Sequence, residues 1–166
     1  IVACANAATD VASAPFELAP LGRPPKLIVP QTPTAISGLV QNEVRSLLKD
    51  HRLEPRQIAI LGPASKAKGP LATVSAIDGV PLIDDASQWR DGKGILCSTA
   101  RSFKGLEADV VILCDFSGLG SLFTVSDLYV ALTRARSHLV IVAHDRAAKE
   151  TLDVALAAAV ATGAEE

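Results

Sequence analysis

The hydrophobic residues of this chain fall in short continuous runs, separated by polar segments that often contain glycine or proline. The runs predict strands at residues 27–29, 57–61, 79–82, 95–99, 110–114 and 139–143. The apolar residues of each run are consecutive and do not alternate with polar ones. We therefore expect a sheet that is covered on both faces.

Apolar residues at helical spacing occur between several of these strands. The spacing predicts helices at residues 34–49, 126–136 and 146–161 and a short one at 70–77, whereas the polar segment 84–94 predicts turns. Thr32 or Thr34 is a candidate cap for the first helix, and Thr124 with Asp127 gives a capping-box pattern before the second. Alternating strands and helices predict the α/β class, with a mainly parallel sheet of about six strands and helices on both faces.

Length and charge narrow the class of protein. The chain has 166 residues, of which 20% are charged, and its formal net charge is −2. This length suits one compact domain, and the longest apolar runs are far shorter than the ~18 residues of a membrane span. The net charge argues against coating of nucleic acid through bulk positive charge, although it leaves room for a local basic groove. The first residues carry no basic segment of the kind that begins a secretory signal.

Three cysteines and three histidines are scattered along the chain without the spacing of metal ligands. We therefore predict no metal site within these residues. Cys97 and Cys114 lie inside apolar runs. Such positions are typical of buried thiols in a reducing compartment, which favours a cytoplasmic location.

The first segment with candidate functional side chains follows the predicted strand 95–99. Thr99, Arg101 and Ser102 stand at the carboxyl end of that strand, where ligand sites of α/β sheets form. A hydroxyl, a guanidinium and exposed backbone amides are suited to hold a phosphate. The alternative for these residues is a solvated crossover between two strands, with charges that bind nothing.

The second segment is the predicted helix 126–136. Arg134 lies roughly 200° around a helix from Leu132, since each residue turns by about 100°, and it need not be buried with the core. A guanidinium near a strand edge suits a phosphate or a carboxylate. The alternative here is an ordinary solvated helix face.

Together the two segments closely resemble motifs V and VI of superfamily 1 helicases of the UvrD/Rep type. Thr99 and the residues Lys104-Gly105-Leu106-Glu107 match motif V in order and spacing, and Tyr129 to Ala135 match motif VI. Weaker resemblances cover residues 1–6, 57–61 and 79–81. One departure is Arg101, because this family usually has a histidine at that position.

The resemblance implies a RecA-like fold and a particular place in a helicase. Residues 26–166 resemble motor domain 2A, and residues 1–25 the end of a preceding helix with a proline-rich connection. Only residues 83–94 separate two of the predicted strands, so the large 2B insertion of longer family members is absent. The chain has no P-loop sequence. We expect it to be a C-terminal piece of a longer helicase whose domain 1A carries the P-loop and the Mg²⁺ ligands.

The resemblance also implies roles for individual residues. Arg134 corresponds to the arginine finger that acts on ATP, Glu107 to a residue that binds the nucleotide ribose, and Gly105 to a close approach of the backbone. The residues that correspond to contacts with single-stranded DNA are Thr99, Arg101, Ser102 and Lys104. The isolated chain is expected not to hydrolyse ATP.

Two other classes of function compete with this interpretation. A stand-alone RecA-like module would regulate a partner ATPase by lending it Arg134. A small-molecule α/β enzyme would place its site at the end of the strand 95–99, but the segment offers no obvious pair of nucleophile and base. Lys66 and Lys68 are either phosphate contacts or members of a solvated loop.

Overall fold

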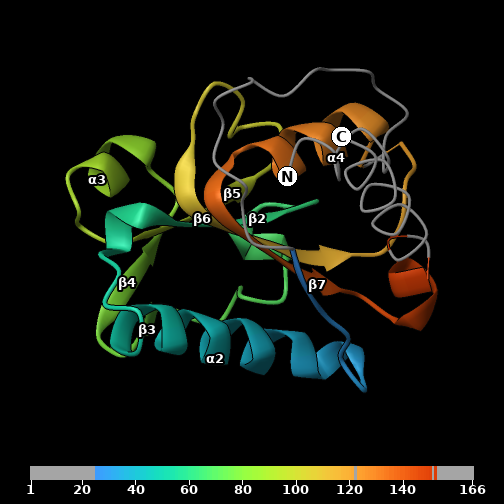
Figure 1. Ribbon diagram of the computed structural model, residues 1–166, viewed down its shortest axis with the longest axis horizontal. Coiled ribbons are helices and arrows are strands. Elements are labelled where there is room, and N and C mark those ends of the chain that lie inside the picture. Colours follow the sequence, from blue (N-terminus) through green and yellow to red (C-terminus); the bar gives the residue numbers. More distant parts are fainter. Residues whose placement is uncertain (1–24, 122, 151, 153–166) are drawn as a thin grey trace, which may run out of the picture.

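The computed structural model describes residues 25–121, 123–150 and 152. These residues form a twisted sheet with helices on both sides (Figure 1). The expected N-terminal helix end lies outside the described residues. The expected closing helix is helical at residues 146–150 and 152, and the rest of it lies outside the described residues.

The sheet has seven strands in the order β1-β7-β6-β2-β5-β4-β3, and β3 is the antiparallel member. The strands are β1 (Lys26–Ile28), β2 (Ile58–Gly62), β3 (Ala76–Ile77), β4 (Val80–Ile83), β5 (Ile95–Thr99), β6 (Ala108–Phe116) and β7 (Ala135–Ala143). The predicted mainly parallel α/β fold is confirmed. The strand missing from the prediction is β3, which forms a short hairpin with β4.

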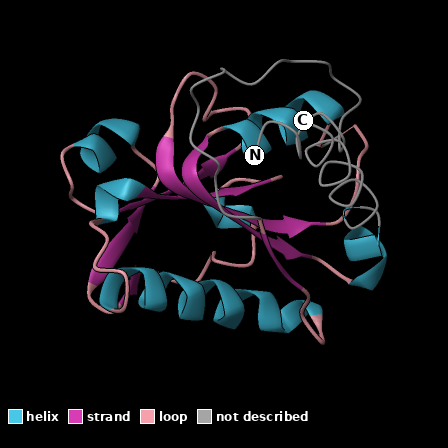
Figure 2. Ribbon diagram, viewed as in Figure 1, coloured by secondary structure: helices cyan, strands magenta, loops and turns pink. Residues whose placement is uncertain are grey.

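Helices cover the two faces of the sheet unequally. The helix α2 (Ile36–Lys49) lies along one face, while α3 (Ala86–Arg90) and α4 (Val125–Thr133) lie on the other. Short 3-10 helices are found at Pro33–Ala35, Pro55–Gln57 and Lys66–Lys68. Figure 2 shows the resulting three layers, with the strands between the two sets of helices.

The central strand β2 shows why a continuous apolar run was required. All five of its residues are buried. Ile58 and Ile60 pack into the core beneath α2, whereas Ala59 and Leu61 pack into the core beneath α4. Because successive side chains of a strand point to opposite faces, a strand that is covered twice needs an apolar residue at every position.

The strand β6 contains a bulge near its end. Its register against β7 shifts between Cys114 and Phe116, and Asp115 has a positive φ of 62°. The bulge turns Phe116 toward the α4 face, where its ring meets that of Phe123 edge to face at 5.9 Å. This position explains why an aspartate interrupts the apolar run near the end of β6.

Two segments differ from the prediction for local reasons. Residues 70–77 form no helix: residues 70–73 form a turn, and β3 follows at Ala76. The apolar side chains of Leu71 and Ile77 are buried in the core beneath α2. The polar segment 84–94 contains α3, which Asp85 caps by accepting hydrogen bonds from the backbone N–H groups of Ser87 and Gln88. Trp89 anchors this helix by donating from Nε1 to the Ile58 carbonyl at 3.0 Å.

The predicted helix 126–136 is too long. α4 ends at Thr133, Arg134 is its C-cap, and β7 already begins at Ala135. The backbone N–H of Ala108 donates to the Arg134 carbonyl at 3.1 Å, and Ala108 then pairs with Ala135. Pairing with β6 thus ends the helix early, and Arg134 stands at a helix-to-strand junction instead of on a helical face.

Candidate functional site

The predicted site residues lie at two opposite edges of the sheet. β5 and β6 both run parallel to β2, so Thr99 at the end of β5 lies at the carboxyl edge. Glu107 directly precedes β6, and Arg134 directly precedes β7, which places both at the amino edge. The chain between Thr99 and Glu107 crosses from one edge to the other.

At the carboxyl edge, Thr99 and Ser102 hold each other in a tight turn. The Thr99 hydroxyl donates to the Ser102 hydroxyl at 2.9 Å and accepts from the backbone N–H of Ser102 at 3.1 Å. The ring of Phe103 is fully buried behind the turn and packs against Trp89, with ring centroids 5.8 Å apart. The structure therefore brings these two predicted DNA-contact residues together on a firmly anchored turn.

Arg101 projects from the same turn, and its guanidinium forms an ion pair within the chain. Its Nη2 and Nε donate to the two carboxylate oxygens of Asp127 at 2.9 Å and 3.3 Å. Asp127 lies in the first turn of α4 and also accepts hydrogen bonds from Thr124, which confirms the predicted capping box. The Arg101 guanidinium, followed by the Thr124 backbone, holds the pKa of the Asp127 carboxyl below its usual range.

Sequence reasoning missed the contact between Arg101 and Asp127. The two residues are 26 positions apart, and Asp127 lies outside both motifs. Together with Thr99 and the ring of Phe123 they line a hollow of about 90 Å³ at the carboxyl edge. No local pattern signals this contact, because only the parallel arrangement of β5 and β6 brings the start of α4 beside the turn.

The remaining residues of the turn carry the chain to the amino edge. Lys104 is exposed, and Gly105 has a φ of +83°, a conformation that side chains rarely adopt. Nothing lies within 4 Å of a Cβ built on Gly105, so its glycine requirement comes from the backbone and not from crowding. Leu106 packs against the core beneath α4 and fixes the turn before Glu107.

At the amino edge, the guanidinium of Arg134 has few partners. Its Nη2 donates to the Thr133 hydroxyl at 3.3 Å, and its buried Nε has no hydrogen-bond partner among the described residues. No carboxylate of the described residues forms an ion pair with Arg134. An unpaired buried donor is costly for a protein. This side chain is therefore the strongest candidate in the described chain for binding an external anion.

Glu107 lies in a polar hollow of about 330 Å³ at the same edge. The residues that line the hollow are Glu54, Arg56, Gln57, Glu107, Ala108, Asp109 and Arg136. Gln57 donates to Asp109 at 2.7 Å, and Arg136 approaches the other oxygen of Asp109 at 3.9 Å. Sequence reasoning had assigned no role to Gln57, Asp109 or Arg136, although Gln57 begins the predicted strand 57–61 and Asp109 directly precedes the predicted strand 110–114.

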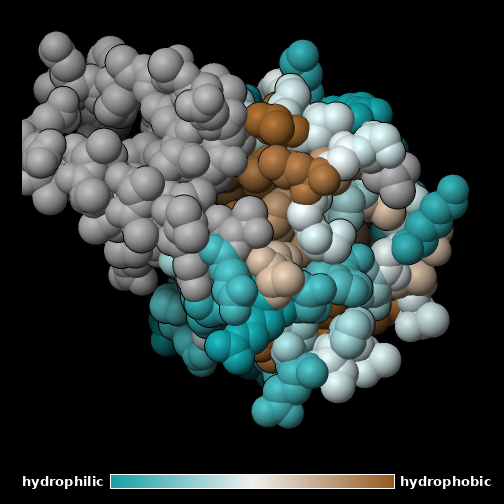
Figure 3. All heavy atoms as spheres, turned by 90° about the vertical axis from the view of Figure 1, so that its right-hand side faces the viewer, coloured by the Kyte–Doolittle hydropathy of each residue, from teal (hydrophilic) through white to brown (hydrophobic). Residues whose placement is uncertain are grey.

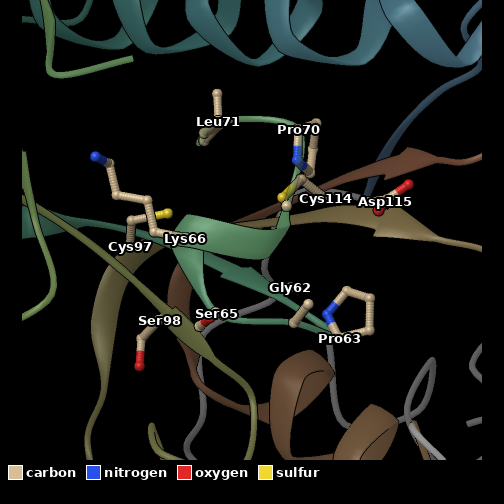
Figure 4. A pocket seen from close by; sticks show the side chains of 12 residues that line it. Gly62, Pro63, Ser65, Lys66, Pro70, Leu71, Cys97, Ser98, Cys114 and Asp115 are labelled. Carbon is tan, nitrogen blue, oxygen red and sulfur yellow. The ribbon is translucent and has the colours of Figure 1, made fainter. Parts of the chain in front are cut away.

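A separate small pocket lies at the carboxyl ends of β2, β5 and β6. Figure 4 shows the side chains of Cys97, Cys114 and Lys66 around it. Burial raises the pKa of the Cys97 thiol to about 11 and also raises that of Cys114. Both thiols are therefore protonated at neutral pH and are packing groups, as their apolar runs predicted.

The ends of β6 and β7 are joined by a further polar contact. Nδ1 of His144 lies 2.6 Å from Oδ1 of Asp115, and the backbone N–H of His144 donates to the Phe116 carbonyl at 2.7 Å. The pair closes the carboxyl end of the bulge. Within the described ranges, no group of His, Cys, Asp and Glu side chains is arranged to hold a metal ion.

The surface is mostly hydrophilic on the side that Figure 3 presents, with apolar side chains gathered in one area. Leu119 and Val125 are the exposed large hydrophobic residues of the described part of the chain. None of the described helices combines the length and the apolar character that crossing a membrane would require.

The fold is an α/β domain with a seven-stranded, mainly parallel sheet, as a RecA-like domain has. Residues 94–142 match the family model of the UvrD-like helicase C-terminal domain. The matched segment includes β5, β6 and α4 and contains every predicted site residue. The resemblance to UvrD-type helicases is thus confirmed over this segment, and it supports a DNA helicase motor domain.

A solved structure is similar over a larger part of the chain. The C-terminal domain of a possible DNA helicase from Lactobacillus plantarum WCFS1 superposes with a TM-score of 0.53 at 22% sequence identity, and the alignment covers 74% of each chain. At this identity the similarity establishes the fold. No curated protein sequence matches the chain.

Proposed function

We propose that this chain is the C-terminal motor domain of an ATP-dependent superfamily 1 DNA helicase. In this proposal the amino edge of the sheet faces the nucleotide, and the carboxyl edge contacts single-stranded DNA. Domain 1A of the same polypeptide supplies the P-loop and the ligands of Mg²⁺. The family match over residues 94–142 supports the helicase assignment.

The observation that carries the proposal is the state of Arg134. The side chain ends a helix, has a buried Nε without a partner among the described residues, and forms no ion pair with a carboxylate of the described chain. A guanidinium in this state is suited to a phosphate that another domain brings. It fits motif VI, in which the corresponding arginine acts as the finger.

Arg134 has a defined chemical task in this proposal. Mg²⁺ held by domain 1A would neutralise part of the charge of the phosphates. Arg134 donates hydrogen bonds to the γ-phosphoryl group as negative charge develops there, and such a finger typically contributes ~10³–10⁵ in rate. Glu107, which is exposed beside the polar hollow, accepts hydrogen bonds from the ribose hydroxyls.

The carboxyl edge has a different task. The hydroxyls of Thr99 and Ser102 and the exposed ammonium of Lys104 contact the sugar-phosphate backbone. Contacts of this kind position a strand without reading its sequence. The turn that carries them continues directly to Gly105 and Glu107, so one segment serves both edges.

The test is DNA-stimulated ATP hydrolysis by the native protein that carries this chain. Arg134→Ala is expected to lower kcat by about 10³-fold or more while binding of single-stranded DNA persists. Arg146→Ala is the matched control, because Arg146 is exposed and, among the described residues, forms an ion pair with Glu150 alone. Unchanged kcat in Arg134→Ala would refute the proposal. The isolated chain is expected to show no turnover.

A further inference from the structure

Asp127 is the buried charged side chain of the described residues, with 7% of its surface exposed. Its carboxylate accepts four hydrogen bonds, two from Thr124 and two from Arg101. The bonds from Thr124 satisfy the start of α4, as a capping box requires. The hydrogen bonds from Arg101 are not part of the cap, so the cap does not explain why Arg101 lies against Asp127.

The contact with Asp127 leaves one side of Arg101 free. Nε and Nη2 face the carboxylate, while Nη1 makes no hydrogen bond to the described residues. The Arg101 side chain is 70% exposed, in contrast to 10% for the side chain of Asp127. Because a guanidinium carries five N–H donors in a rigid fork, its outer edge remains available for a second anion.

We propose that Asp127 is a positioning residue that holds Arg101 by its Nε side and presents the Nη1 side to a nucleic-acid phosphate beside Thr99 and Ser102. This inference rests on the proposed function. A free arginine side chain loses rotamer entropy when it is fixed. The contact with Asp127 fixes Arg101 before the phosphate arrives, so binding of DNA does not bear that cost.

The proposal accounts for the departure from motif V. Where the family pattern has a histidine, this chain has the longer Arg101, and the same chain provides a carboxylate within 2.9 Å of it. The depressed pKa of Asp127 means that this carboxylate is charged at neutral pH. The pair is therefore ionic under the conditions in which DNA binds.

A double-mutant cycle on the native protein that carries this chain tests the proposal. The variants are Arg101→Ala, Asp127→Asn and both together, and the readout is the Kd for an oligo(dT) strand at several salt concentrations. Arg101→Ala is expected to weaken binding about tenfold. It should also reduce the slope of log Kd against log salt by about 0.7, the value for one phosphate contact on single strands.

Asp127→Asn keeps an oxygen that can accept from Thr124 but loses the charge. It is expected to weaken binding severalfold, and to have no further effect when Arg101 is already alanine. Thr124→Val is the structural control, because it removes the hydroxyl of the capping box and leaves the contact between Arg101 and Asp127 in place. We expect it to lower thermal stability and to change the Kd by less than about twofold.

The outcomes separate this inference from the proposed function. Additive effects of Arg101→Ala and Asp127→Asn, or an equal loss of affinity in Thr124→Val, would overturn the positioning role and leave the helicase proposal standing. An unmodified protein that does not bind oligo(dT) would overturn both. In that case the kcat of the unmodified protein shows whether an ATPase without DNA contact remains, and its loss in Arg134→Ala shows whether Arg134 serves that ATPase.

Discussion

Each of the two edges of the sheet presents an arginine from a helicase-like motif, but only one of the two arginines has a carboxylate partner among the described residues. At the carboxyl edge Arg101 lies against the buried carboxylate of Asp127. At the amino edge Arg134 has a buried Nε without a partner among the described residues. In the proposed function, Arg101 contacts an exposed strand and is fixed by an internal partner, whereas Arg134 gains its partner only when the nucleotide is present.

The contrast extends to the way in which each edge is built. The side chains at the carboxyl edge are held by hydrogen bonds within the chain, from Thr99 to Ser102 and from Thr124 to Asp127. The amino edge is a wider polar hollow around Glu107. A preformed surface suits a flexible strand that must be held without sequence readout, and an open hollow suits a ligand that a second domain closes upon.

The largest expected effect is a loss of stability when Trp89 is replaced, because Trp89 supports the turn that joins the two edges. Trp89→Ala removes a buried ring that packs on Phe103 and holds the Ile58 carbonyl, so we expect about 3–5 kcal/mol of lost stability. Urea unfolding of the domain measures it.

The control for this change is Trp89→Phe. It keeps an aromatic ring against Phe103 and leaves the Ile58 carbonyl without its donor, so a loss of only about 1–3 kcal/mol is expected. If both variants unfold at the same urea concentration, the ring packing does not support the turn between the two edges.

A smaller effect is confined to the carboxyl edge. Thr124→Val removes the hydroxyl that accepts from the Asp127 N–H and donates to its carboxylate, and we expect about 1 kcal/mol of lost stability. Thermal unfolding measures the change, with Val125→Thr as a solvent-exposed neighbour for comparison. A stability equal to that of the unmodified protein would show that the capping box does not support the start of α4.

The smallest effect is a dependence on pH at the carboxyl edge. The folded-state pKa of Asp127 lies below its unfolded value of about 3.9, first because of the Arg101 hydrogen bond. Its contribution to stability is therefore complete above about pH 4 and is lost as the pH falls through the folded pKa.

Urea unfolding between about pH 3 and 7 measures this contribution as the difference between the protein and Asp127→Asn. The pKa values of Asp78 and Asp85 are also depressed, the first chiefly by Lys49 and the second chiefly by Ser87, so both proteins lose stability in acid. We expect a shallower loss in Asp127→Asn. Parallel curves would show that the carboxylate gains nothing from Arg101.

The sequence predicted the layers of the fold, and it singled out Thr99, Glu107 and Arg134, but it did not show how the two edges are made. The strand 95–99 and the capping box at Thr124 were local patterns and are confirmed. The early start of β7 at Ala135 depends on pairing with Ala108, which no local pattern contains. The same holds for Asp127 and Arg101. α3 was missed because five residues carry too little periodicity, although Asp85 is a recognisable cap.

The central claim is that the two edges serve two ligands, and one pair of variants tests it most directly. Both kcat for ATP and the Kd for oligo(dT) are measured for Arg134→Ala and for Arg101→Ala in the native protein that carries this chain. We predict that Arg134→Ala lowers kcat by about 10³-fold or more with little change in Kd. We predict that Arg101→Ala raises the Kd about tenfold and leaves kcat at saturating DNA nearly unchanged. If the two variants lower kcat and weaken DNA binding to the same extent, the division of labour between the edges is wrong.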